Sequence, residues 1–125
     1  STYHQLGIVA QAQRQWAPAE RYYQQALQIY IDFNDRYEQA GTYHQLGRVA
    51  EEREQWQSAV GYFFNALETY VAYQDEHNRN IVLRGLGRVW QATQDAALPA
   101  RVAAILGVSQ SEARELLAGG GATAN

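Results

Sequence analysis

The chain of 125 residues contains no Cys, no Met and no Lys. Without Cys it has no disulfide, no thiol nucleophile and no thiolate metal ligand. All ten of its basic residues are therefore Arg. Because Met is missing even at position 1, we interpret the chain as a fragment of a larger scaffold or signalling protein, with targeting signals expected elsewhere.

Net charge and long apolar runs are also scarce. A net charge of −3 gives no support for bulk electrostatic binding to nucleic acid or to a membrane surface. No apolar run approaches the ~20 residues of a membrane span, and no secretory signal opens the chain. The content of 46% hydrophobic and 18% charged residues is typical of a folded domain. We expect a cytoplasmic domain without nucleic-acid or membrane partners.

What the chain does contain is an internal repeat of forty residues. The hexapeptide Thr-Tyr-His-Gln-Leu-Gly at 2–7 recurs at 42–47, and residues 1–40 are identical to residues 41–80 at sixteen positions. A fixed period of this size predicts stacked supersecondary units, none of which buries its apolar face alone. Such arrays usually bind other molecules rather than transform them.

Each unit contains two apolar stripes at helical spacing. The first runs through Tyr3, Leu6, Gly7 and Ala10, at i, i+3, i+4 and i+7. The second begins at Ala19, and Pro18 precedes it in a position suited to the first turn of a helix. The pattern predicts helices near 1–13, 17–33, 36–53, 57–74, 79–94, 99–106 and 109–118.

The units divide the chain into repeats at 1–35, 36–75 and, in part, 76–97. The segment 98–118 breaks the pattern and predicts two short helices, separated by Gly107 and by a capping box over Ser109–Glu112. We interpret this segment as a C-terminal cap that hides Val102, Ile105, Leu106 and Leu116, and we expect a flexible tail at 119–125. In the middle unit we expect burial of Leu46, Ala50, Ala59, Phe63, Ala66, Leu67 and Tyr70.

The repeat resembles the tetratricopeptide repeat family. The family's signature is matched by Leu6-Gly7, Ala19, Tyr23 and Ala26-Leu27 in the first unit, and by the residues forty positions later. The usual period is 34; the longer period resembles that of kinesin light chains, spindle-orientation adaptors and bacterial STAND-type sensors. HEAT and armadillo arrays share the period but lack this residue order. The resemblance implies an all-α fold: a right-handed superhelical array of antiparallel helix pairs with a two-helix cap.

The resemblance also implies a function, which is non-catalytic binding of a protein or peptide in a concave groove lined by the first helices. Arg48, Arg84 and Arg88 would form a basic strip there, suited to bidentate binding of an acidic or C-terminal carboxylate peptide. The alternative is a solvated face on which Arg48 pairs with Glu51 or Glu52. The groove positions are His4, Gln11, His44, Gln45, Arg48, Glu51, Glu52, Arg84, Arg88 and Gln91, with Ile8, Ala12 and Ala92 beside them.

Other readings have less support in the sequence. No catalytic motif or cofactor site is visible, and His4 and His44 occupy one repeat position without the further ligands that zinc needs. The Trp and Tyr residues fit an aromatic cage less well than packing between helices. The segment 103–113 resembles a helix-turn-helix, but in and around it Arg101 and Arg114 are balanced by Glu112 and Glu115, which leaves no basic footprint for DNA. The alternative function is self-association as a homodimer through the N-terminal end, whose apolar face lacks a neighbouring unit.

Overall fold

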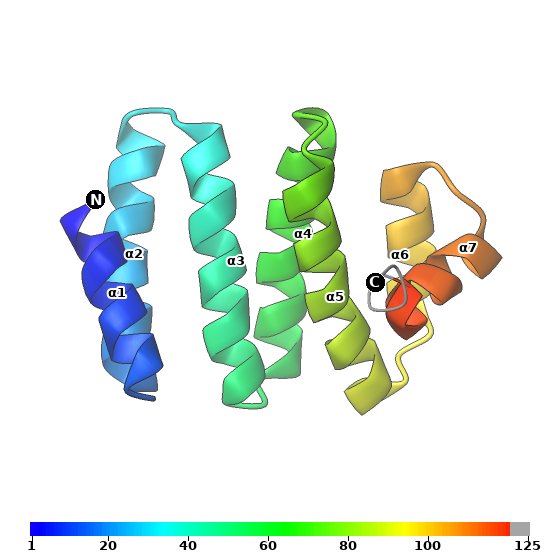
Figure 1. Ribbon diagram of the computed structural model, residues 1–125, viewed down its shortest axis with the longest axis horizontal. Coiled ribbons are helices and arrows are strands. Elements are labelled where there is room, and N and C mark those ends of the chain that lie inside the picture. The colour runs from blue at the N-terminus through cyan, green and yellow to red at the C-terminus, as the bar shows by residue number, and fades with distance from the viewer. Residues whose placement is uncertain (121–125) are drawn as a thin grey trace.

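The computed structural model describes residues 1–120 and shows helices standing side by side along one axis, with the N-terminus at one end (Figure 1). No strand occurs in this described part, and the predicted all-α fold is confirmed. Of the tail expected at 119–125, Gly119 has a non-helical backbone with a φ of 105°, and 121–125 lie outside the described residues. The elements are α1 (Thr2–Ala12), α2 (Trp16–Asp32), α3 (Arg36–Glu52), α4 (Trp56–Ala72), α5 (Glu76–Thr93), α6 (Ala97–Leu106), α7 (Gln110–Glu115) and the turn η1 (Leu116–Gly120).

The helices from α2 to α5 begin at intervals of twenty residues, and the turns between helices have the same period. One non-glycine residue in each turn has a φ of 55–60°, in the left-handed region that often closes a helix. Asp35 and Asp75 cap the helices that follow, because each side chain accepts a hydrogen bond from a backbone N–H three residues on. The left-handed residues are Arg14, Asn34, Glu54, Gln74 and Gln94.

Glycines in the first helices allow close contact with aromatic rings of the second helices. A Cβ on Gly47 would lie 2.6 Å from a ring carbon of Phe63, and a Cβ on Gly7 equally close to Tyr23. The tip of the same Phe63 ring also meets Gly85, where an added Cβ would lie 2.9 Å from the Cζ atom. The Phe63 ring therefore fills the space between two glycines of consecutive units.

The middle unit is buried as its two neighbours require. The expected set is confirmed: every member of it lies in the core, and Phe63, Ala59, Ala66 and Leu67 have no exposed surface. One core cluster runs from α3 to the C-terminal turn, and a smaller one joins α1 and α2 to α3. Within residues 1–120 no helix has both the length and the apolar character needed to cross a bilayer.

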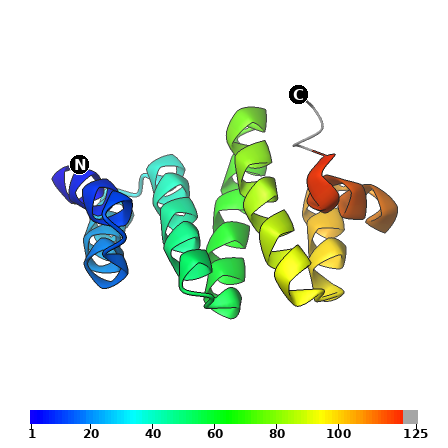
Figure 2. The same cartoon turned by 60° about the horizontal axis from the view of Figure 1, so that its bottom comes forward.

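The third helix pair departs from the regular pattern. Ala103 of α6 stands forty positions after Phe63, so no ring is available to pack against Gly87 of α5. The backbone of η1 takes that place: a Cβ on Gly87 would lie 2.4 Å from the carbonyl oxygen of Leu117. η1 packs on α5 and continues from α7, as Figure 2 shows.

The residues hidden by the C-terminal segment differ in part from those expected. Val102 is fully buried as predicted, but Ile105, Leu106 and Leu116 are only half-buried. Leu117 is buried instead, because η1 turns this side chain toward the core when it packs on α5. The predicted capping box at the start of α7 is confirmed by both of its hydrogen bonds.

Candidate functional site

A cavity of about 380 Å³ lies between α1, the start of α2 and α3. Four of the groove residues expected from the sequence meet around it: Gln11, Gln45, Arg48 and Glu52. Ile8, Ala12 and Trp16 complete its wall. From the sequence, Trp16 was expected in the packing between helices and was not counted among the groove residues. Its place at the turn between α1 and α2 is the sequence signal that could have indicated its position in the cavity wall.

The cavity combines an apolar wall with hydrogen-bonding groups. Ile8 is 40% exposed and Trp16 is half-buried, so both offer apolar surface to a ligand. The Tyr23 hydroxyl donates a hydrogen bond of 2.6 Å to Oε1 of Gln11, which orients the Gln11 amide and leaves its NH₂ group as a donor. Burial raises the pKa of Tyr23 to about 12, against the opposing effect of the nearby Arg48 cation. Tyr23 is therefore a neutral donor at pH 7.

Arg48 supplies the positive charge of the cavity. Within residues 1–120 its guanidinium forms no ion pair and no side-chain hydrogen bond. The alternative pairing with Glu51 or Glu52 on the same helix is thus not formed. The same holds for Arg84, which lies exposed on α5 one helical turn from Arg88. Both guanidinium groups are therefore without an acidic partner among the described residues.

Arg88 is engaged differently from the other two arginines. Its Nε donates a 2.6 Å hydrogen bond to one oxygen of Glu51, and its Nη2 a 3.0 Å bond to the other. These bonds raise the pKa of Arg88 above its ordinary value. The pair joins α3 to α5, so the basic strip expected from the sequence is interrupted at this point. Gln91, one turn further along α5, is exposed.

The two repeated histidines turn away from the cavity toward the aromatic rings of the second helices. The ring of His44 lies 5.8 Å from that of Phe63, and His4 lies 5.7 Å from Tyr23. One nitrogen of each ring is buried without a hydrogen-bond partner among the described residues. Burial, followed by the charges of Arg48 and Arg88, lowers the pKa of His44 to about 4. Burial also lowers the pKa of His4. His44 is therefore a neutral support beneath the groove.

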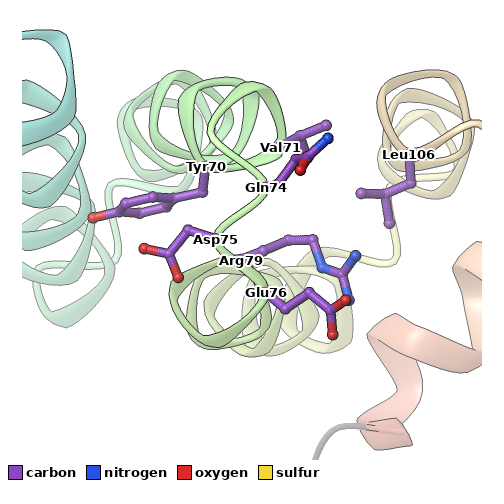
Figure 3. A pocket seen from close by; sticks show the side chains of 7 residues that line it. All are labelled: Tyr70, Val71, Gln74, Asp75, Glu76, Arg79 and Leu106. Atoms are coloured by element: carbon purple, nitrogen blue, oxygen red, sulfur yellow. The ribbon is translucent and has the colours of Figure 1, made fainter.

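A second cavity, of about 330 Å³, lies between the end of α4, the start of α5 and Leu106 of α6 (Figure 3). The cavity forms because α6 is shorter than α4. Position 112 is the repeat equivalent of Ala72, the last residue of α4, but α6 already ends at Leu106, six residues earlier. Its carboxylate Asp75 is already occupied, since it accepts hydrogen bonds from the Tyr37 hydroxyl and the Asn78 side chain. These bonds lower the pKa of Asp75. Its lining residues are Tyr70, Val71, Gln74, Asp75, Glu76, Arg79 and Leu106.

The described part of the chain contains no group of three His, Cys, Asp or Glu side chains arranged to hold a metal ion. What it does contain is a row of first helices with polar side chains on one face and a ligand-sized cavity between two of them. The fold and this face define an α-helical repeat protein of the binding class.

The family model of the tetratricopeptide repeat matches residues 1–70, more than half of the chain. The protein therefore belongs to the tetratricopeptide repeat family, as its Leu-Gly and Ala-Leu positions predict. Repeats of this family mediate protein–protein interactions and are typically non-catalytic. No curated protein and no solved structure matches the chain.

Proposed function

We propose that the protein binds a peptide segment of a partner protein in the groove of its first helices, with a carboxylate of the peptide on Arg48. The observation that carries this proposal is the cavity beside Arg48, which has apolar, amide and cationic groups within one wall. Ligand sites commonly combine an apolar lining with a few polar groups that fix orientation. An acidic side chain or a free C-terminus would meet the guanidinium in the bidentate geometry that carboxylates favour.

The other residues of the cavity indicate which further peptide groups would bind there. An apolar side chain next to the carboxylate would pack on Ile8 and Trp16, whose apolar surfaces are accessible. The amides of Gln11 and Gln45 can both donate to and accept from an extended peptide backbone. Glu52, at the rim, disfavours a second negative charge on that side. The groove continues over α5, where Arg84 and Gln91 are exposed.

Replacing Arg48 with Ala is expected to weaken binding of a carboxylate peptide about fivefold, the effect of losing roughly 1 kcal/mol at a solvent-accessible charge contact. Binding to the wild type should also weaken as salt rises, because the charges are screened. Isothermal titration calorimetry with the free-acid peptide and its C-terminal amide measures both effects.

The matched control is Arg21→Ala, which removes the same charge from an exposed position on α2, outside the groove cavity. This variant should bind like the wild type. Equal affinities of the Arg48→Ala and Arg21→Ala variants would exclude Arg48 as the carboxylate contact. Equal affinities for acid and amide peptides would exclude the carboxylate itself.

Self-association is a second candidate function, favoured by the outer face of α1. Leu6 and Val9 are 40% and 53% exposed, whereas the same residues of the next unit, Leu46 and Val49, are 1% and 2% exposed. In the middle unit the neighbouring α2 covers this face. In α1 nothing in residues 1–120 covers it, and burial of these side chains against a second copy would remove apolar surface from water.

A Leu6→Glu variant tests this self-association. Sedimentation equilibrium of the wild type should show a mass that rises with concentration, and the variant should remain monomeric, because a charge at the centre of an apolar contact is costly to bury. Glu replaces an exposed side chain, so folding of the variant should be unaffected. A wild-type mass that stays monomeric at all concentrations would exclude the dimer.

A further inference from the structure

The Arg88–Glu51 pair crosses the groove from α5 to α3 with both hydrogen bonds of a bidentate contact formed. This is the geometry in which a guanidinium receives the carboxylate of a bound peptide. Glu51 therefore holds the position that a ligand carboxylate would take on Arg88. Arg84, one helical turn away on the same helix, has no such partner among the described residues.

We propose that Glu51 is an internal competitor that closes a second carboxylate subsite formed by Arg84 and Arg88. The inference rests on the proposed function, since the subsite belongs to the same peptide groove. The wild-type groove then accepts a peptide whose carboxylate lies on Arg48. A second acidic residue that reaches α5 meets only Arg84, and a single solvent-exposed charge contact adds little to affinity. Glu51 thereby limits the number of acidic peptide residues that contribute to the affinity of the groove.

The exposed fractions of the two side chains show which of them should be replaced to open the subsite. The Glu51 side chain is 14% exposed and that of Arg88 is 47% exposed. A mostly buried carboxylate needs its partner, because an unpaired buried charge is costly. Arg88 is already half in water and remains hydrated when Glu51 is neutralised. Glu51→Gln is therefore the informative change, whereas removal of Arg88 would leave a buried carboxylate uncompensated.

A ligand also competes with Glu51 at a disadvantage. Glu51 is tethered beside Arg88 by the fold, so its effective concentration exceeds that of any free peptide carboxylate. In the Glu51→Gln variant this competition ends, because an uncharged amide attracts the guanidinium far less than a carboxylate does. The variant keeps the size and shape of the side chain, so the packing between α3 and α5 is retained.

The test uses peptides with a free C-terminus and one Glu placed at successive positions before it, and a second series with Gln in place of that Glu. We expect the Glu51→Gln variant to bind at least one Glu peptide about tenfold more tightly than the wild type does, which corresponds to about 1.4 kcal/mol. The Gln peptides should show no such gain.

The matched control is Glu20→Gln, which neutralises the carboxylate of the other ion pair in the described residues, Arg53–Glu20 at 3.4 Å. This pair joins α2 to the residue that follows α3, and it lies outside the groove cavity. The control should bind all peptides like the wild type. A tenfold gain in this variant as well would indicate a general charge effect and overturn the subsite.

The outcomes separate the competitor from the proposed function. If the wild type binds free-acid peptides and Glu51→Gln shows no gain for any Glu peptide, the competitor is excluded and the groove function stands. If only Glu51→Gln binds, and binds Glu peptides selectively, the competitor stands and the wild-type function is excluded. If neither protein binds, both are excluded.

Discussion

Replacing Leu67 with Ala is expected to lower the free energy of unfolding by about 2–5 kcal/mol, the usual range for emptying a leucine site in a core. Leu67 has no exposed surface and lies in the main core cluster, with neighbouring units on both sides. The loss combines the transfer of the side chain with the cavity left behind. Urea denaturation of the wild type and the variant measures it from the midpoint and the slope of each transition.

Leu27→Ala is the matched comparison, because Leu27 occupies the same repeat position in the first unit. Its side chain is 7% exposed and belongs to the smaller core cluster. Its replacement should therefore destabilise the protein less than that of Leu67. A Leu67→Ala protein with the denaturation midpoint of the wild type would show that this side chain does not contribute to the core.

Acidification is expected to destabilise the fold by about 3 kcal/mol through His44 alone. The pKa of this residue is lowered from 6.5 to about 4 in the folded state, chiefly by burial, and each pKa unit corresponds to about 1.4 kcal/mol. The folded state thus favours the neutral ring. Its contribution is fully present above about pH 6.5 and is lost as the pH falls toward 4, because the unfolded chain binds the proton first.

A His44→Leu variant isolates this contribution from the carboxylates, which titrate in both proteins. The stability difference between wild type and variant, measured by urea denaturation at pH 7 and at pH 4, should shift by about 3 kcal/mol in favour of the variant at pH 4. The exposed His77, replaced by Leu, serves as the control, because it removes a histidine from the surface and not from the packing against Phe63. A constant difference between the wild type and the His44→Leu variant at both pH values would contradict the burial of a neutral ring.

The helices and turns of the regular units follow from local sequence signals. Apolar spacing fixes the helix faces, and Asp35 and Ser109 mark helix starts that the structure has. The packing of the third unit was predicted less well, because it depends on a contact between residues that are far apart in the sequence. The loss of a ring at Ala103 was visible in the sequence, but the packing of the Leu117 backbone on Gly87 was not.

The groove shows the same division between periodic and individual features. Repeat position alone puts Gln11, Gln45, Arg48 and Glu52 near one another, and the structure has them around one cavity. The same periodicity assigned His44 to the groove, although its ring lies against Phe63. Consecutive residues of a helix point about 100° apart. At a position between the core face and the groove face, the spacing of apolar residues therefore does not decide whether the side chain packs in the core or lines the groove.

The contact of Phe63 with Gly47 and Gly85 has a consequence for how the array unfolds. The stability of a repeat array is approximately the sum of terms for each unit and terms for each junction. The ring of Phe63 contributes to both at once, because its two glycines belong to consecutive units. Tyr23 contacts Gly7, but the position that corresponds to Gly85 is Gln45. The second and third units should therefore unfold together, while the first helix pair opens separately and exchanges its amide hydrogens sooner.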